Sequence, residues 1–314
     1  MSDRPGSDDF GSRIEAFRRE LTAHCYRMTG SADDAEDLVQ ETYLRAWRAQ
    51  EGFEGRSSLR VWLYRIATNA CLNALAHSSR RVLPSGLGAP GEDPFAEPVL
   101  AGPDVRWLQP FPTDPADAME LRASVRLALI ASLQVLTPQQ RAVLILRDVL
   151  AFSAAETAQV LELTVAAVKS TLQRARSAVT SEPELAEPGD PRARAWLDGY
   201  MAAWERSDVQ ELTRVLQRDA VLEMTPSRTW FQGFDTCIAY MRQALGTPDT
   251  WRAVPVEANG QPAAGAYLRG ADGVHRAFAL SVLTPGRTGL ARVTLFGVPV
   301  QPGLFERFGL PLTL

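Results

Sequence analysis

Three successive helices with N-terminal capping signals, within residues 137–179, constrain the fold of this chain more than any other feature. Thr137-Pro138-Gln139-Gln140 supplies an N-cap, a proline at the first helical position and a glutamine three residues after the cap. Ser153 and Glu156 repeat this arrangement, and Thr164 can cap a third helix. Apolar residues on the third helix recur at spacings of three and four: Val165, Val168, Leu172, Ala175 and Val179. The pattern predicts a helix-turn-helix with a shared core.

The opposite face of the third helix carries polar and basic side chains. These are Lys169, Ser170, Gln173, Arg174 and Arg176. Short and long donors projecting from one helix suit the major groove of DNA, while the preceding helix crosses the backbone. The alternative interpretation is an ordinary solvated face of a three-helix bundle.

A second amphipathic helix is predicted after Ser31, and its outer face is acidic. Residues 31–48 contain five acidic residues against Arg45 and Arg48. The predicted buried stripe consists of Ala35, Leu38, Val39, Thr42, Ala46 and Trp47. Asp37, Gln40 and Glu41 are left near or on the outer face. Because an acidic surface repels phosphate, the expected partner is a basic protein surface, and the alternative is a solubilising face.

The next segment, residues 53–81, has the opposite charge and interleaved aromatic residues. A loop at residues 54–58 precedes a predicted helix that carries Trp62, Tyr64, Arg65, Asn69 and Asn73. Basic groups, amides and aromatic rings suit melted DNA, where bases stack and backbone charge is neutralised. Trp62, Leu63 and Ile66 are expected to be largely buried, so Arg60, Asn69 and Asn73 are the better contact candidates. The net charge of −4 hides this segregation.

Composition divides the chain into several domains. Residues 12–81 read as helical, residues 82–117 as a linker dense in proline and glycine, and residues 118–180 as the helix-turn-helix domain. Residues 181–191 form a second linker, and residues 192–314 combine two helices with short strands, which is typical of an α+β domain. Linkers of this composition predict domains that move relative to one another.

Several classes of protein are disfavoured by composition. No apolar run is long enough to span a bilayer, and the polar N-terminus lacks the apolar stretch of a signal peptide, so a cytoplasmic protein without a membrane partner is expected. Three scattered cysteines argue against a disulfide framework. Three histidines form no cluster at metal-ligand spacing, so no metal or other cofactor is expected.

Together these segments resemble the extracytoplasmic-function (ECF) subgroup of the sigma-70 family of RNA polymerase sigma factors. DAEDLVQETYLRAW (residues 34–47) resembles the helix that docks on the clamp helices of the largest polymerase subunit. SSLRVWLYRIATNACLNAL (residues 57–75) resembles the helices that melt and read the minus-ten element. LTPQQRAVLILRDVLAFSAAETAQVLELTVAAVKSTLQRAR (residues 136–176) resembles the domain that reads the minus-thirty-five element.

The resemblance implies a role for each candidate residue. Asp37, Gln40 and Glu41 become polymerase-docking residues. Ser57, Ser58 and Arg60 are implied at the loop that captures a minus-ten base. Those implied in the minus-thirty-five major groove are Lys169, Ser170, Gln173 and Arg174. Asn69, Asn73 and Arg176 are candidates for DNA contact from their residue types and helix positions alone. Basic residues after Leu75 are sparser than is usual in the family, which weakens the expected minus-ten backbone contact.

Residues 192–314 resemble the SnoaL-like, NTF2-type fold, a curved antiparallel sheet wrapped by helices into a cone with an interior pocket. Trp107, Leu108 and Pro110, in the sequence WLQP, resemble a motif shared by ECF groups that carry such an extension. The resemblance implies an alternative sigma factor controlled by its own C-terminal domain, with core RNA polymerase and promoter DNA as partners. It also allows a small-molecule ligand in the cone.

Two other interpretations are open at this point. One is a DNA-binding repressor that never contacts polymerase, for which the acidic helix has no use. The other is an isomerase- or cyclase-like enzyme fused to a DNA-binding module, with Glu223 or Tyr240 facing the cone interior beside Arg252, Asn259 or His275. We expect these polar groups to be structural, and we expect no catalytic residue.

Overall fold

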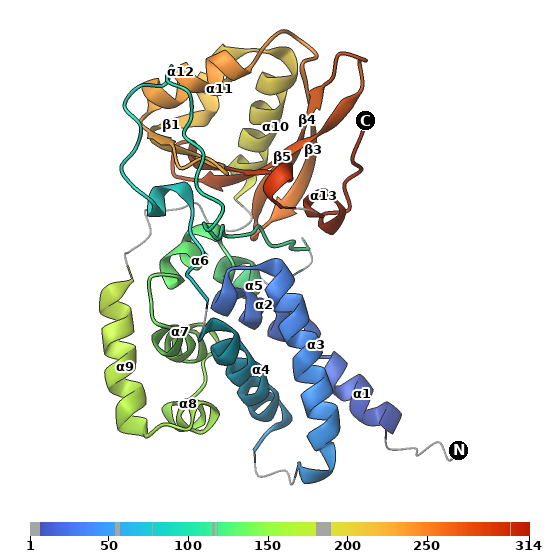
Figure 1. Cartoon of the computed structure of the whole chain (residues 1–314), viewed down its shortest axis with the longest axis vertical. Coiled ribbons are helices and arrows are strands. Elements are labelled where there is room, and N and C mark those ends of the chain that lie inside the picture. The colour runs from blue at the N-terminus through green and yellow to red at the C-terminus, as the bar shows by residue number, and fades with distance from the viewer. Residues whose placement is uncertain are drawn as a thin grey trace. The chain divides into compact units, whose positions relative to one another are not determined.

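The computed structural model describes residues 7–53, 57–76, 78–114, 117, 119–179, 190–301 and 303–314. These residues fall into two compact units, one within Met1–Arg81 and Ala128–Ser181 and the other within Val82–Leu127 and Glu182–Leu314. The segment predicted as the first linker thus packs with the C-terminal residues (Figure 1). Most of the second predicted linker lies outside the described residues, as do residues 54–56 of the predicted loop.

The first part of the helical unit contains α1 (Ser7–Glu15), α2 (Arg18–Thr29), α3 (Ala32–Ala49), a 3-10 turn (Gln50–Gly52) and α4 (Leu59–Leu75). The Ser31 hydroxyl accepts a hydrogen bond from the Asp34 amide at 3.1 Å, which confirms the predicted cap of α3. The predicted apolar stripe of α3 is buried up to Ala46. Trp47, near the end of the helix, is an exception at 43% exposure, and its ring lies beside that of Phe10 of α1 with ring centroids 6.0 Å apart.

The second part of the helical unit contains α6 (Leu127–Leu133), α7 (Pro138–Leu144), a π-helical turn (Ile145–Val149), α8 (Ala154–Leu161) and α9 (Val165–Ala178). Both predicted capping boxes form, at Thr137 and at Ser153, and Thr164 caps α9. Val168, Leu172 and Ala175 are buried as predicted. Val165 is 41% exposed, because it occupies the first turn of α9, beyond the packed core.

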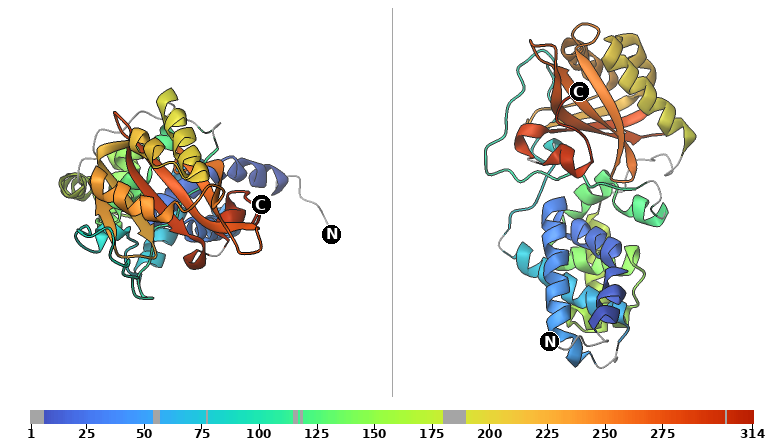
Figure 2. Two further views of the ribbon diagram at one scale, coloured as in Figure 1. Left: turned by 90° about the horizontal axis from the view of Figure 1, so that it is seen from above. Right: turned by 90° about the vertical axis from the view of Figure 1, so that its right-hand side faces the viewer.

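The second unit contains a six-stranded sheet with helices against it (Figure 2). Val82–Leu127, here called the connector, joins the two helical segments along the chain and belongs to this unit. The connector contributes a 3-10 turn (Pro84–Gly86) and α5 (Met119–Ser124), and the C-terminal part begins with α10 (Pro191–Arg206) and α11 (Val209–Val215). Then follow β1 (Leu216–Thr225), β2 (Trp230–Gln232), α12 (Phe234–Ala244), β3 (Trp251–Ala258), β4 (Gln261–Arg269), β5 (His275–Pro285), β6 (Leu290–Gly297), a 3-10 turn (Val298–Val300) and α13 (Leu304–Arg307).

The strand order is β2-β1-β6-β5-β4-β3. β1 runs parallel to β6 and the other neighbours are antiparallel, so the sheet is mixed and not purely antiparallel as expected. The helices α10, α11 and α12 cover one face, where Tyr200 and Met241 share a core with Leu222 and Val293. At the other face α13 places Phe305 against Tyr267, with ring centroids 5.1 Å apart. Among the described residues, no helix is both long enough and apolar enough to cross a bilayer.

A buried histidine makes the stability of the helical unit depend on pH. His24 is fully buried and shares a 2.9 Å hydrogen bond with Thr68 of α4, so it is part of the core of this unit. Burial, together with the charges of Arg27 and Arg60, lowers the pKa of His24 to about 3.

The unfolded chain binds a proton at this histidine below about pH 6.5, and the folded chain does not. The stabilising contribution is therefore complete above that pH and is lost as the pH falls toward 3. We expect the free energy of unfolding of this unit to drop by about 1 kcal/mol between pH 7.0 and pH 5.5. This drop can be measured by amide hydrogen exchange in α2 and α4 at the two pH values, after correction for the pH dependence of the intrinsic exchange rates. An equal drop in His24→Gln would exclude this histidine as the source.

Candidate polymerase and nucleic-acid interfaces

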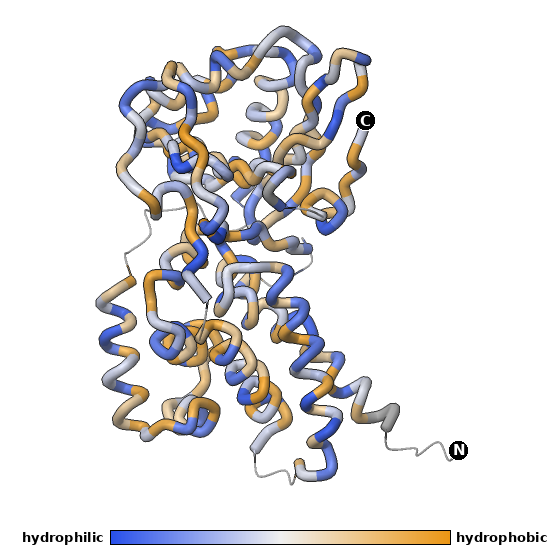
Figure 3. Tube along the Cα trace, viewed as in Figure 1, coloured by the Kyte–Doolittle hydropathy of each residue, from blue (hydrophilic) through white to orange (hydrophobic). Residues whose placement is uncertain are grey.

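The exposed face of α3 combines acidic and apolar side chains. Asp37 and Gln40 are exposed, and Glu41 is half-buried with its carboxylate 2.6 Å from the Arg45 guanidinium. Leu44 continues this face at 59% exposure. Hydrophilic positions alternate with apolar ones along the whole helix (Figure 3). The sequence thus located the acidic face correctly, and it missed the apolar part, which a protein partner would bury.

The candidate minus-ten residues lie at the start and in the last turns of α4. The Ser58 hydroxyl caps the helix by accepting from the Val61 amide at 3.2 Å, and Ser57 is half-buried just before it. Asn69 and Asn73 lie one turn apart near the other end of the helix, the first half-buried and the second exposed. Trp62 and Leu63 are buried as predicted, whereas Ile66 is half-buried.

Arg60, a candidate DNA contact, is occupied by protein groups in this structure. Its guanidinium lies 4.6 Å from the centre of the Phe152 ring and 5.1 Å from the centre of the Tyr64 ring. It also pairs with Glu20 at 3.3 Å. Phe152 precedes α8, so the minus-ten candidate surface of α4 is in contact with the helix-turn-helix.

A buried arginine reinforces this contact within the helical unit. Arg141 of α7 is 3% exposed, and its guanidinium donates a hydrogen bond to the Met28 carbonyl of α2. It also donates to the Gln134 side chain at 2.7 Å and to the Leu136 carbonyl at 3.2 Å. The desolvation of the guanidinium lowers the pKa of Arg141 to about 10, so it keeps its charge at neutral pH. The two helical segments are therefore joined by a polar contact as well as an apolar one.

The outer face of α9 presents the predicted recognition surface. All five candidates are exposed: Lys169, Ser170, Gln173, Arg174 and Arg176. Ser170, Gln173 and Arg174 line a shallow hollow. Arg176 instead pairs with both carboxylate oxygens of Asp148, at 2.7 and 2.8 Å, so part of its charge is already neutralised.

The connector between the two helical segments is held by the C-terminal domain. Trp107, Leu108 and Pro110 are buried, Trp107 forms a bridge with Val82, and the Leu108 carbonyl accepts from Gln301 at 3.1 Å. Backbone bonds join other connector residues to the strands and turns of the domain: Gly91 to Trp230, Val99 to Arg228, Ala101 to Pro226, and Phe111 to Asn259. The connector is thus a bound segment of the domain.

Three buried polar side chains, two on strands and one in the turn between β3 and β4, hold the connector, and the sequence did not reveal this role. The Glu223 carboxylate accepts from the Ser85 amide at 2.9 Å and pairs with Arg292 at 2.5 Å. The Asn259 side chain accepts from the Phe111 amide at 2.9 Å and donates to the Val125 carbonyl at 2.7 Å. The Gln261 side chain accepts from the Leu127 amide at 2.9 Å. Unsatisfied, such buried groups would cost about 1–3 kcal/mol each.

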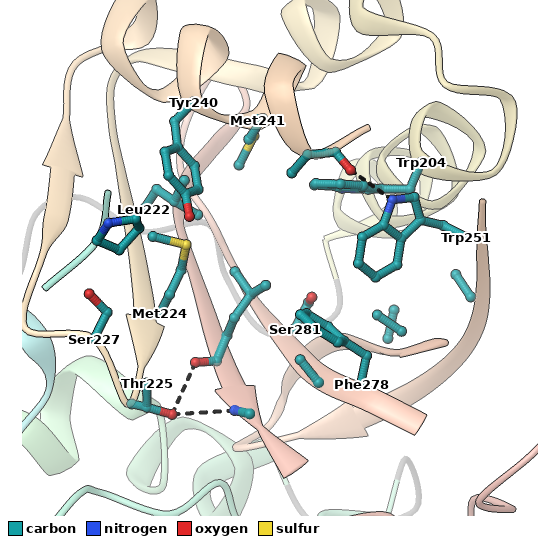
Figure 4. Close-up of a pocket in the computed structure, with 18 of the residues that line it drawn as sticks. Trp204, Leu222, Met224, Thr225, Ser227, Tyr240, Met241, Trp251, Phe278 and Ser281 are labelled. Carbon is teal, nitrogen blue, oxygen red and sulfur yellow. Dashed lines mark hydrogen bonds between the residues drawn. The ribbon is translucent and has the colours of Figure 1, made fainter. Parts of the chain in front are cut away.

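A cavity lies between the sheet and the helices of the C-terminal domain (Figure 4). Tyr240 and Arg252 line it, as the enzyme interpretation required. Glu223 does not, because residues alternate between the faces of a strand and its neighbours Leu222 and Met224 are the ones that face the cavity. Asn259 is bound to the connector, and His275 is bound to the Asp249 carbonyl at 3.0 Å. The proposed acid/base carboxylate is therefore outside the cavity.

Comparison with protein families matches both helical segments. Residues 13–81 match the model for sigma-70 region 2, and residues 126–179 match the model for sigma-70, region 4. A region 2 and region 4 pair followed by a mixed-sheet domain defines a multidomain sigma factor.

Two relatives from Mycobacterium tuberculosis identify the subgroup of sigma factors to which the chain belongs. It is 47% identical over 319 residues to the ECF RNA polymerase sigma factor SigG, covering 98% of this chain and 85% of that protein. It is 34% identical over 211 residues to the ECF RNA polymerase sigma factor SigJ, and the match covers 66% of this chain and 62% of that protein. The crystal structure of SigJ superposes with a TM-score of 0.63 at 26% identity, covering 96% of this chain and 99% of that one. The chain belongs to the ECF RNA polymerase sigma factors.

Proposed function

We propose that this sigma factor binds core RNA polymerase through the α3 face containing Asp37, Gln40 and Glu41. In this proposal the start and outer face of α4 contact the minus-ten element, and the outer face of α9 contacts the minus-thirty-five element. The observation that carries the proposal is the segregation of charge, with an acidic face on α3 and exposed basic and amide groups on α9. A repressor that acts without polymerase has no need of the α3 face.

The helical unit must open for both promoter elements to be contacted at once. Elements about 25 base pairs apart are separated by about 85 Å of B-form DNA. A compact body of about 135 residues has a radius of gyration of only about 14 Å. Because Arg60 stacks on Phe152 inside this body, region 2 and region 4 occupy a closed arrangement that is incompatible with simultaneous binding.

We propose that the C-terminal domain controls this opening through the connector. The connector is the only covalent link between region 2 and region 4, and Glu223, Asn259 and Gln261 fix it along the sheet. A connector held in this way cannot extend freely when the regions separate. Its release would favour the open, polymerase-competent arrangement.

Loosening the connector should raise transcription. Asn259→Ala removes two hydrogen bonds to the connector, and Trp107→Ala removes its largest buried ring, so we expect each variant to increase promoter-specific transcript at least threefold with core polymerase. A chain truncated at Pro191 should also yield more promoter-specific transcript than the full-length chain. Arg218→Ala, an exposed change on β1, is the control. Unchanged or lower output in all three altered chains would contradict the restraint.

We further propose that the chain catalyses no reaction of its own and acts in the cytoplasm, where polymerase and promoters are found. The position of Glu223 supports the first part. Its carboxylate is fully buried, bound to Arg292 and to the Ser85 amide, and Glu223 is not among the residues that line the cavity. Turnover of a steroid- or polyketide-like substrate that is lost in Glu223→Gln would overturn this proposal.

A further inference from the structure

The cavity of the C-terminal domain has the size of a small-molecule site. Its volume is about 400 Å³, within the range of about 300–1,000 Å³ that is usual for such sites. It is formed by the face of the sheet that α10 and α12 cover. The walls are rich in aromatic, sulfur-containing and aliphatic side chains, including Trp204, Leu222, Met224, Tyr240, Trp251 and Phe278 (Figure 4).

The walls offer no free charge to a ligand. Among the described lining residues Arg252 alone is charged, and its guanidinium is 2.6 Å from the Asp249 carboxylate with half of the side chain exposed. A charged group inside the cavity would therefore lose its hydration without gaining a counter-charge. The walls favour an uncharged molecule.

A few hydroxyl groups give the cavity specific polar points. The Tyr240 hydroxyl points into it and has no hydrogen-bond partner in the described part of the chain (Figure 4). Burial raises the pKa of Tyr240, so this group stays a neutral donor at physiological pH. The Ser281 hydroxyl accepts from Tyr200 at 3.4 Å, whereas those of Thr225 and Ser227 already donate to backbone carbonyls. One or two hydrogen bonds to a ligand oxygen or nitrogen are thus available.

The connector forms part of the cavity wall. Pro98 and Leu100 line it, and Leu100 is 68% exposed although it contributes to this wall. The segment around Leu100 is held by backbone bonds from the Arg228 amide to the Val99 carbonyl at 2.8 Å and from the Ala101 amide to the Pro226 carbonyl at 3.0 Å. Two side-chain bonds add to them, from the Val99 amide to the Thr229 hydroxyl at 2.9 Å and from the Ser227 hydroxyl to the Val99 carbonyl at 3.1 Å. A molecule in the cavity would cover Leu100 and so add apolar contact to this segment.

We propose that the cavity binds an uncharged, predominantly aromatic or alicyclic molecule that carries a hydroxyl, amine or carbonyl group, and that the bound molecule tightens residues 98–101 on the domain. Binding and the mobility of the connector are then coupled, because the ligand contacts the two together. The residues that line the cavity are not among those proposed to contact polymerase and DNA. Its test needs neither of them, so its failure would leave the proposed sigma function untouched.

A matched pair of fluorescent probes tests the ligand class on the full-length chain. N-phenyl-1-naphthylamine is uncharged, and 8-anilino-1-naphthalenesulfonate has the same ring system with an added negative charge. We expect saturable binding of the neutral probe with an affinity at least tenfold higher than that of the sulfonate. Equal affinities, or no saturable binding of the neutral probe, would overturn the proposed chemistry.

Two variants locate the binding in this cavity. Ala266→Phe adds a ring to the cavity wall and should weaken the neutral probe at least tenfold, and Leu100→Ser should weaken it at least threefold. Leu100 is largely exposed, so its substitution leaves folding intact even if Ala266→Phe disturbs it. Ala195→Phe places the same ring on the exposed face of α10 and should leave affinity within twofold. Wild-type affinity in Leu100→Ser would contradict the connector contact.

The coupling is measured by amide hydrogen exchange across residues 95–103. We expect the saturating neutral probe to slow exchange of the Ala101 amide at least threefold in the wild-type chain and to have no such effect in Leu100→Ser. Unchanged exchange in a chain that binds the probe would refute the coupling.

Discussion

Asp37→Arg combined with Glu41→Arg should abolish measurable association of the chain with core RNA polymerase. Both residues lie on the outer side of α3, and the substitutions reverse the sign of the face proposed to meet a basic partner surface. Losing one partner of a desolvated charge pair costs about 2–5 kcal/mol, and reversal adds repulsion. We expect affinity to fall about a hundredfold or more in a binding titration with labelled sigma factor.

The control for this variant is an equivalent charge change elsewhere. Asp235→Arg reverses an exposed carboxylate in the first turn of α12, in the C-terminal domain, and should leave core binding within twofold. Circular dichroism should show equal helix content in both variants. If the α3 variant binds core polymerase like the wild-type chain, the acidic face is only a solubilising surface.

Phe152→Ala should open the helical unit. The Phe152 ring is 2% exposed and contacts both Arg60 and Tyr64 of α4, so truncation removes the aromatic part of the contact between region 2 and region 4. Truncating a buried phenylalanine costs about 3–5 kcal/mol of stability. Part of this cost comes from the contacts with Arg60 and Tyr64, which exist only in the closed arrangement, so the closed arrangement is destabilised relative to the open one. We expect the open population to rise about tenfold or more.

Distances between spin labels at Arg45 of α3 and Ser177 of α9 report this opening. Both positions are exposed, and the three native cysteines are buried, so labels attach at the introduced sites. The variant should show a new population of long distances. Phe53→Ala removes a ring whose centre is 4.9 Å from that of Trp62 within region 2, and it should not produce this population. An unchanged distribution in Phe152→Ala would mean that the aromatic contact does not hold the regions together.

Local features of this fold were predictable from the sequence. Thr137, Ser153 and Thr164 cap their helices as expected, because a cap depends on side chains and amides only three residues apart. The buried stripes of α3 and α9 followed from helical periodicity in their middle turns. The prediction of burial was wrong at the helix ends, at Trp47 and Val165, where each helix extends beyond the core that it packs against.

Contacts between distant segments were not predictable. Glu223 meets Ser85 across 138 residues and Asn259 meets Phe111 across 148, and nothing near either polar residue indicates its partner. The same difficulty applies to the parallel pairing of β1 with β6 and to the contact of Arg60 with Phe152. Residue types indicated which surfaces bind nucleic acid or protein, whereas tertiary packing decides which of them are accessible.

Transcription in vitro with purified core polymerase on a promoter library tests the central claim most directly. The account predicts initiation from a defined subset of promoters by the full-length chain, and none by the Asp37→Arg and Glu41→Arg double variant. A wild-type chain that neither associates with core polymerase nor yields a transcript from any promoter would contradict it.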